Sequence, residues 1–69
     1  MNPIDKQKAI AIISVQNSVE VSFNVPVTDN YSNCYDILIH KSNATTINDL
    51  IKAGFSLSMS DKGLSVNKY

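Results

Sequence analysis

Tryptophan and arginine are absent from this chain of 69 residues, which also has only one cysteine, one histidine, two glycines and two prolines. Small secreted domains normally carry paired cysteines, so the single Cys34 excludes a disulfide scaffold and favours a cytoplasmic protein. One cysteine and one histidine are too few for a zinc site within one chain, and two isolated glycines cannot build a phosphate-binding loop. We therefore expect no metal or other cofactor.

Long hydrophobic runs and net charge are missing as well. The apolar run Ala9–Ile13 is far too short for a membrane span or a signal-peptide core, so we expect no membrane contact and no targeting segment. Six acidic residues balance six basic ones, all of which are lysine, so no net field attracts nucleic acid or an anionic surface. Without arginine, bidentate recognition of guanine or phosphate is disfavoured too.

What is present is enough apolar surface for a folded domain. Hydrophobic residues make up 43% of the chain and charged residues 17%, which is typical of globular proteins. Residues 1–69 form one domain, and a domain of this size buries only about 60% of its unfolded surface. We therefore expect its stability to depend on a well-packed core, on self-association or on a partner that covers part of it.

The first segment fits two different elements. Residues Asn2-Pro3-Ile4-Asp5 have the form of a helix start, with Asn2 as the cap and Pro3 at the first helical position. The run Ala9–Val15, however, is rich in β-branched side chains and apolar on both faces of a strand, which is typical of a buried strand. We favour the strand, and a helix over residues 3–15 is the alternative.

Two further strands follow. Apolar and polar residues alternate from Val19 to Val27, which predicts a strand with one dry and one wet face, and Pro26 predicts that the end of this strand lies at a sheet edge. Residues 28–33 are predicted to form a loop. The segment Cys34–Lys41 is predicted as the next strand, with its isoleucines facing the core. Both phenylalanines, Phe23 and Phe55, are expected in the core, because they lie within apolar alternations.

A helix and a hairpin complete the chain. Thr46-Ile47-Asn48-Asp49 has the form of a capping box and Gly54 that of a C-terminal cap, which together predict a helix of about two turns. Residues 55–60 and 64–67 then alternate around a turn at residues 61–63, which predicts a hairpin. The fold class is therefore α+β, in the order β-β-β-α-β-β. We expect a small antiparallel or mixed sheet of about five strands, with one short helix packed on one face.

The helix, the residues Ala53-Gly54-Phe55 and the hairpin resemble the helix–hairpin half of small docking domains found at the termini of modular biosynthetic enzymes. This resemblance covers Thr46–Tyr69 only. The strands before it depart from those domains, so the resemblance assigns no family to the chain.

No combination of residues points to catalysis. Cys34 and His40 lie six residues apart on one predicted strand, which is about 20 Å, and Asp36 and His40 are about 13 Å apart. None of these pairs can form a dyad within one chain. The serines have no base at a recognisable spacing and none lies in a nucleophile elbow. We therefore predict that the protein is not an enzyme.

Protein binding is the remaining class of function. Tyrosines are enriched at interfaces, and Tyr31 lies in a polar loop, so we take it as the first candidate anchor, although it fits a role covering the rim of the sheet equally well. The strand Leu64–Lys68 carries few charges and is a candidate edge for pairing with a second copy or a partner. The candidate partner-binding residues are Asp29, Asn30, Tyr31, Tyr35, Lys62, Lys68 and Tyr69.

The predicted function is accordingly a non-catalytic protein-binding module that occludes a surface of a larger host complex. The setting that best fits so small and catalytically empty a chain is a phage or mobile-element inhibitor of a host system, of the anti-CRISPR or another anti-defence type. Two alternatives stay open. One is a small nucleic-acid-associated protein, which the charge balance disfavours, and the other is a docking or assembly subunit that works as a homodimer.

Overall fold

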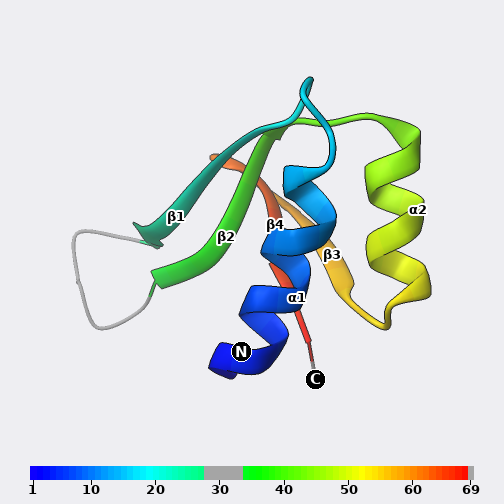
Figure 1. Cartoon of the computed structure of the whole chain (residues 1–69). Helices are drawn as coiled ribbons and strands as arrows, with labels where there is room; N and C mark the ends of the chain where they lie inside the picture. The colour runs from blue at the N-terminus through cyan, green and yellow to red at the C-terminus, as the bar shows by residue number, and fades with distance from the viewer. Residues whose placement is uncertain (28–33, 69) are drawn as a thin grey trace.

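The structure is a computed structural model that describes residues 1–27 and 34–68, and this part of the chain forms two helices and one four-stranded sheet (Figure 1). The elements are α1 (Pro3–Ser14), β1 (Glu20–Pro26), β2 (Cys34–Lys41), α2 (Ala44–Lys52), β3 (Ser56–Ser60) and β4 (Gly63–Asn67). The strand order is β1-β2-β4-β3, and each neighbouring pair is antiparallel. The α+β class is confirmed, whereas five strands and a single helix are wrong.

The difference arises at the N-terminus, where α1 replaces the predicted strand Ala9–Val15. The Asn2 side chain accepts a hydrogen bond of 2.8 Å from the Asp5 backbone N–H, and Pro3 occupies the first turn. Ala9 and Ile13, one helical turn apart, are buried against the sheet. Burial of this face outweighs the preference of β-branched residues for strands, because intrinsic propensity amounts to only a few tenths of a kcal/mol per residue. The alternative, a helix over residues 3–15, is therefore the correct one.

Helix α2 forms where predicted but begins earlier. Its cap is Asn43, whose side chain accepts a hydrogen bond of 2.8 Å from the Thr46 N–H, so the predicted capping box at Thr46 is wrong. Thr46 instead lies inside the helix and is fully buried. The C-terminal end agrees with the prediction, since Gly54 adopts a φ of +93° and the Phe55 N–H donates to the carbonyl of Leu50.

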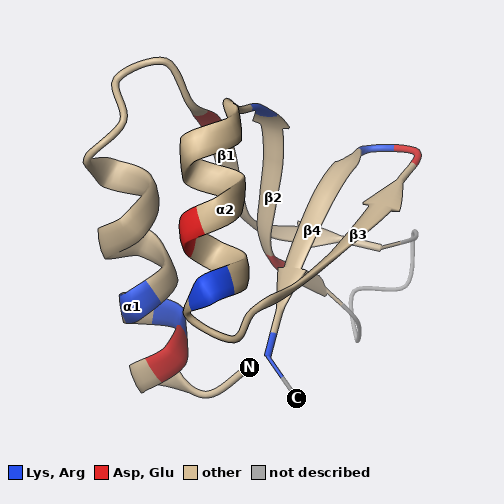
Figure 2. Ribbon diagram, turned by 90° about the vertical axis from the view of Figure 1, so that its right-hand side faces the viewer, with Lys and Arg blue, Asp and Glu red and all other residues tan. Residues whose placement is uncertain are grey.

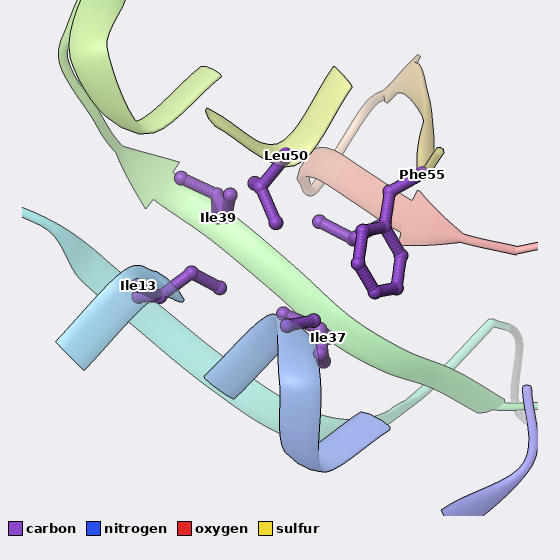
Figure 3. Close-up of a cluster of buried hydrophobic side chains, with 7 residues drawn as sticks. Ile13, Ile37, Ile39, Leu50 and Phe55 are labelled. Carbon is purple, nitrogen blue, oxygen red and sulfur yellow. The ribbon is translucent and has the colours of Figure 1, made fainter. Parts of the chain in front are cut away.

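Both helices cover the same face of the sheet, and the core lies between the helices and the sheet (Figures 1 and 2). Figure 3 shows Ile13 of α1 and Leu50 of α2 beside Ile37 and Ile39 of β2. The predicted isoleucine face of β2 is thus confirmed as the core face. The buried cluster consists of Ala9, Ile13, Ile37, Ile39, Leu50, Phe55 and Val66.

The sheet face that points away from the helices also buries one large side chain. Leu38 alternates with Ile37 and Ile39, so it points to this far face, yet it is fully buried between its cross-strand neighbours Ser22 and Ser65. The ammonium of Lys62, in the turn after edge strand β3, donates a hydrogen bond of 2.8 Å to the carbonyl of Pro26, at the end of edge strand β1. A contact between the two edges requires the sheet to curl, and this curl encloses Leu38.

Candidate protein-binding edge

The structure describes only some of the predicted partner-binding residues. Asp29, Asn30, Tyr31 and Tyr69 lie outside the described residues. Tyr35 is half-buried near the start of β2, opposite Val25 of β1. Lys62 precedes β4 and Lys68 follows it, which separates their backbones by about 20 Å. The Lys62 ammonium reaches the carbonyl of Pro26, next to the Val25–Tyr35 pair, whereas the Lys68 ammonium lies at the C-terminal end of α2.

Both lysines contact the protein itself. Lys62 donates to the Pro26 carbonyl, as described above. Lys68 donates a hydrogen bond of 3.2 Å to the carbonyl of Ala53, and its ammonium lies 5.2 Å from the centre of the Phe55 ring. A cation at the C-terminal end of a helix is favoured by the helix dipole, and its position over an aromatic ring adds a cation–π interaction. Lys62 and Lys68 thus support the fold.

The predicted edge strand is an interior strand. The segment Leu64–Lys68 was expected to offer a free edge, but β4 pairs with β2 on one side and with β3 on the other. Leu64 and Ser65 are therefore engaged by a neighbour on each side, and residues 66–67 pair with β3, so β4 is not an edge strand. The edges of the sheet are β1 and β3.

Strand β1 is a guarded edge, that is, an edge strand with features that oppose pairing with another strand. Pro26 at its end has no N–H to offer to a ladder, which confirms the predicted edge position of this residue. Asn24 has a φ of +55°, which interrupts the extended backbone, and its side chain accepts a hydrogen bond of 2.9 Å from Lys6 of α1. A proline, a distorted residue and an adjacent lysine are common devices that prevent another strand from pairing with an edge.

Strand β3 lacks these devices. Its sequence, Ser-Leu-Ser-Met-Ser, contains no charge and no proline. We call this strand, Ser56–Ser60, the β3 edge. Met59 is 80% exposed, more than any other large hydrophobic side chain in the described part of the chain. An uncharged edge strand with an exposed apolar side chain is a ready template for pairing with another strand.

Met59 also borders a shallow pocket of about 190 Å³ at the end of β2. In the sheet Met59 pairs with Leu64 of β4, which pairs in turn with Ile39 of β2. These three residues form an apolar row that runs from the exposed edge into the core. The pocket is lined by Ile39, His40, Lys41, Ser42, Met59, Gly63 and Leu64. Its lining suits an apolar side chain from a segment that lies along the β3 edge.

One pair of side chains has the geometry of a nucleophile and a base. The Ser22 hydroxyl lies 2.8 Å from Nε2 of His40, because Ser22 pairs with Leu38 and His40 lies two residues further along β2 on the same face. Sequence spacing did not reveal this pair, since its residues are 18 positions apart on different strands. The contact is solvent-exposed, and no described carboxylate contacts the His40 ring to orient it, so the arrangement stops short of a triad.

Further kinds of site find no support in residues 1–27 and 34–68. No group of three or more His, Cys, Asp or Glu residues within them lies close enough to hold a metal ion. Both helices carry charges of both signs, as Figure 2 shows, so neither presents a stripe of positive charge to nucleic acid. In the same part of the chain, no helix has the length and apolar character needed to cross a membrane.

Phe23 differs from its expected place in the core. Phe55 is buried there as predicted, whereas Phe23 is 45% exposed, which makes the expectation for Phe23 wrong. The reason is that β1 is an edge strand, so its side chains have a neighbouring strand on one side only.

Comparison of the chain with protein-family models, with curated proteins and with solved structures finds no match.

Proposed function

We propose that this protein is a non-catalytic protein-binding module that acts by pairing its β3 edge with an extended strand of another polypeptide chain. The observation that carries the proposal is the contrast between the two edges of one sheet. Pro26, Asn24 and Lys6 guard β1, whereas the β3 edge has five residues without charge or proline. Strand addition of this kind is a common mode of peptide recognition.

Different groups of the β3 edge contribute different parts of the binding free energy. Backbone N–H and C=O groups that point away from β4 supply main-chain hydrogen bonds, which give affinity with little dependence on sequence. Met59 supplies the apolar contact, and full burial of such a side chain is worth about 1.5–3 kcal/mol. The adjoining pocket supports the proposal because it offers space beside Met59 for one side chain of the added strand.

The biological setting stays a prediction from the sequence, namely a phage or mobile-element inhibitor that occludes a surface of a host complex. Affinity purification from the native host, followed by identification of the captured complex, tests it directly.

The proposed mode of binding has its own experiment. Amide hydrogen exchange is measured for the protein alone at low concentration and for the protein with its binding partner, whether that partner is a host protein or a second copy. We expect new protection at residues 56–60, and weaker binding for Met59→Lys than for the control Val15→Lys, which places the same charge at a residue 71% exposed outside the sheet. Protection confined to the helices, or equal effects of the two variants, contradicts strand addition at β3.

A further inference from the structure

The β3 edge has the same chemical pattern in both directions. Ser58 is its central residue, with an apolar residue on each side, Leu57 and Met59, and a serine at each end, Ser56 and Ser60. Reversal of the strand therefore exchanges leucine for methionine and leaves every other position unchanged. Such a pattern matters because a two-fold symmetric interface brings one surface patch against itself, so the patch must be complementary to its own reversed copy.

We propose that the strand which pairs with the β3 edge is β3 of a second copy of this chain, antiparallel and centred on Ser58. This inference rests on the proposed function and names the partner. In this register Ser58 lies opposite Ser58 of the partner subunit, Met59 opposite the partner's Leu57, and Ser56 opposite the partner's Ser60. The two four-stranded sheets then join into one continuous sheet of eight strands.

The absence of charge on the β3 edge favours a second copy of this chain as the pairing partner. In an antiparallel pair centred on Ser58 this residue lies opposite its own copy, so a charge there would face a like charge, and like charges directly opposite destabilise a strand pair. The β3 edge carries no charge, so it pays no such penalty. The guarded β1 edge, where Lys6 contacts Asn24 and Pro26 ends the strand, cannot pair with itself in the same way.

The apolar positions also fit this register. Side chains opposite one another on a strand pair lie about 4.5–5.5 Å apart, so each Met59 contacts Leu57 of the partner subunit. Met59, 80% exposed in one copy, is then covered, and the partner's Leu57 comes to lie at the mouth of the pocket beside it. Each pocket is thus completed by a residue of the other copy.

The expected dimer is weak. A strand pair of five residues buries less than the roughly 1,600 Å² of a standard protein interface, so we expect a dissociation constant on the order of 10–100 µM. Sedimentation equilibrium across about 5 µM to 1 mM should therefore follow the change from 7.6 kDa to twice that mass.

A charge swap at the central residue tests both the partner and the register. Ser58 is exposed, and the hydrogen bond that it makes with Ser65 uses its backbone carbonyl, so substitution of its side chain leaves that contact in place. Ser58→Lys and Ser58→Glu should each weaken self-association roughly two- to fivefold, because like charges then lie directly opposite. An equimolar mixture of the two variants should associate at least as well as the unmodified protein. Val15→Lys, the matched control, should dimerise normally.

The outcomes separate this inference from the proposed function. Recovery of the dimer in the mixture supports the second copy and the register centred on Ser58. A protein that stays monomeric at 1 mM, a dimer that tolerates Ser58→Lys, or a mixture that fails to recover overturns the inference. If a host protein nevertheless protects residues 56–60 from amide exchange, strand addition at β3 stands and only the identity of the partner is wrong.

Discussion

Replacement of Gly63 by alanine tests how closely β4 approaches β2. Gly63 begins β4 with a φ of +146°, a conformation that residues with a side chain rarely adopt. A Cβ atom at this position would lie 2.8 Å from the backbone oxygen of Ile39 and 3.3 Å from Cγ of Leu38. The Ile39 oxygen belongs to the β2 backbone and cannot rotate away, so the added methyl group must push the two strands apart.

Two effects lower the free energy of unfolding of this variant. A residue other than glycine in such a region of φ and ψ costs about 1–3 kcal/mol, and an extra methyl group in a packed position costs about 1–3 kcal/mol more. The sum is comparable with the entire free energy of unfolding, which is about 3–10 kcal/mol for a chain of this length. We therefore expect Gly63→Ala to lower the free energy of unfolding by about 2–6 kcal/mol at 25 °C.

Gly54→Ala is the matched control. Gly54 also has a positive φ, +93°, but the nearest atom to its Cβ would be Nζ of Lys68 at 3.3 Å, the end of a flexible side chain. Only the backbone penalty of about 1–2 kcal/mol then remains. Urea unfolding followed by circular dichroism, at one fixed protein concentration, measures both variants. Equal losses for the two alanines would refute the reasoning, because they would show that the contact with the Ile39 carbonyl has no cost.

Two more predictions concern the face of the sheet away from the helices. Leu38→Ala should lower the free energy of unfolding by about 2–5 kcal/mol in the same urea assay, because Leu38 is fully buried there, and a loss below about 1 kcal/mol would show that the curled sheet does not enclose it. Ser22→Ala should leave the hydrolysis of an activated ester such as p-nitrophenyl acetate unchanged, because no described carboxylate orients the His40 ring that Ser22 contacts. A burst of product that depends on Ser22 would contradict the non-catalytic assignment.

Local patterns predicted the strands and the second helix well. The alternation in residues 19–27, 34–41 and 55–67 reflects a sheet with a covered face, and this relation holds whatever the order of the strands. Gly54 marked the end of α2 for an equally local reason, the need for a positive φ. The start of α2 was missed because Asn43 and Thr46 are both residues that cap helices, and only the observed bond between them identifies Asn43 as the cap.

The sequence of the first segment alone could not decide between a helix and a strand. The β-branched residues of Ala9–Val15 favour a strand, while Asn2 and Pro3 favour a helix, and each preference is small. What decides is the burial of Ala9 and Ile13 against Ile37 and Ile39, which lie more than twenty residues further along the chain. The apolar residues of α1 are spread around the helix, so the sequence of α1 itself does not show which face is buried.

The interior position of β4 was missed for a related reason. Which strand lies at the edge depends on the pairing of β2 with β4 across α2, and no short stretch of sequence records that pairing. Lys62 and Lys68 were candidate partner-binding residues, yet Lys62 contacts Pro26 at the end of β1 and Lys68 contacts the C-terminal end of α2. The fold thus uses inside one chain the lysines that would otherwise keep strands apart, and this leaves the β3 edge without a charge of its own to oppose pairing.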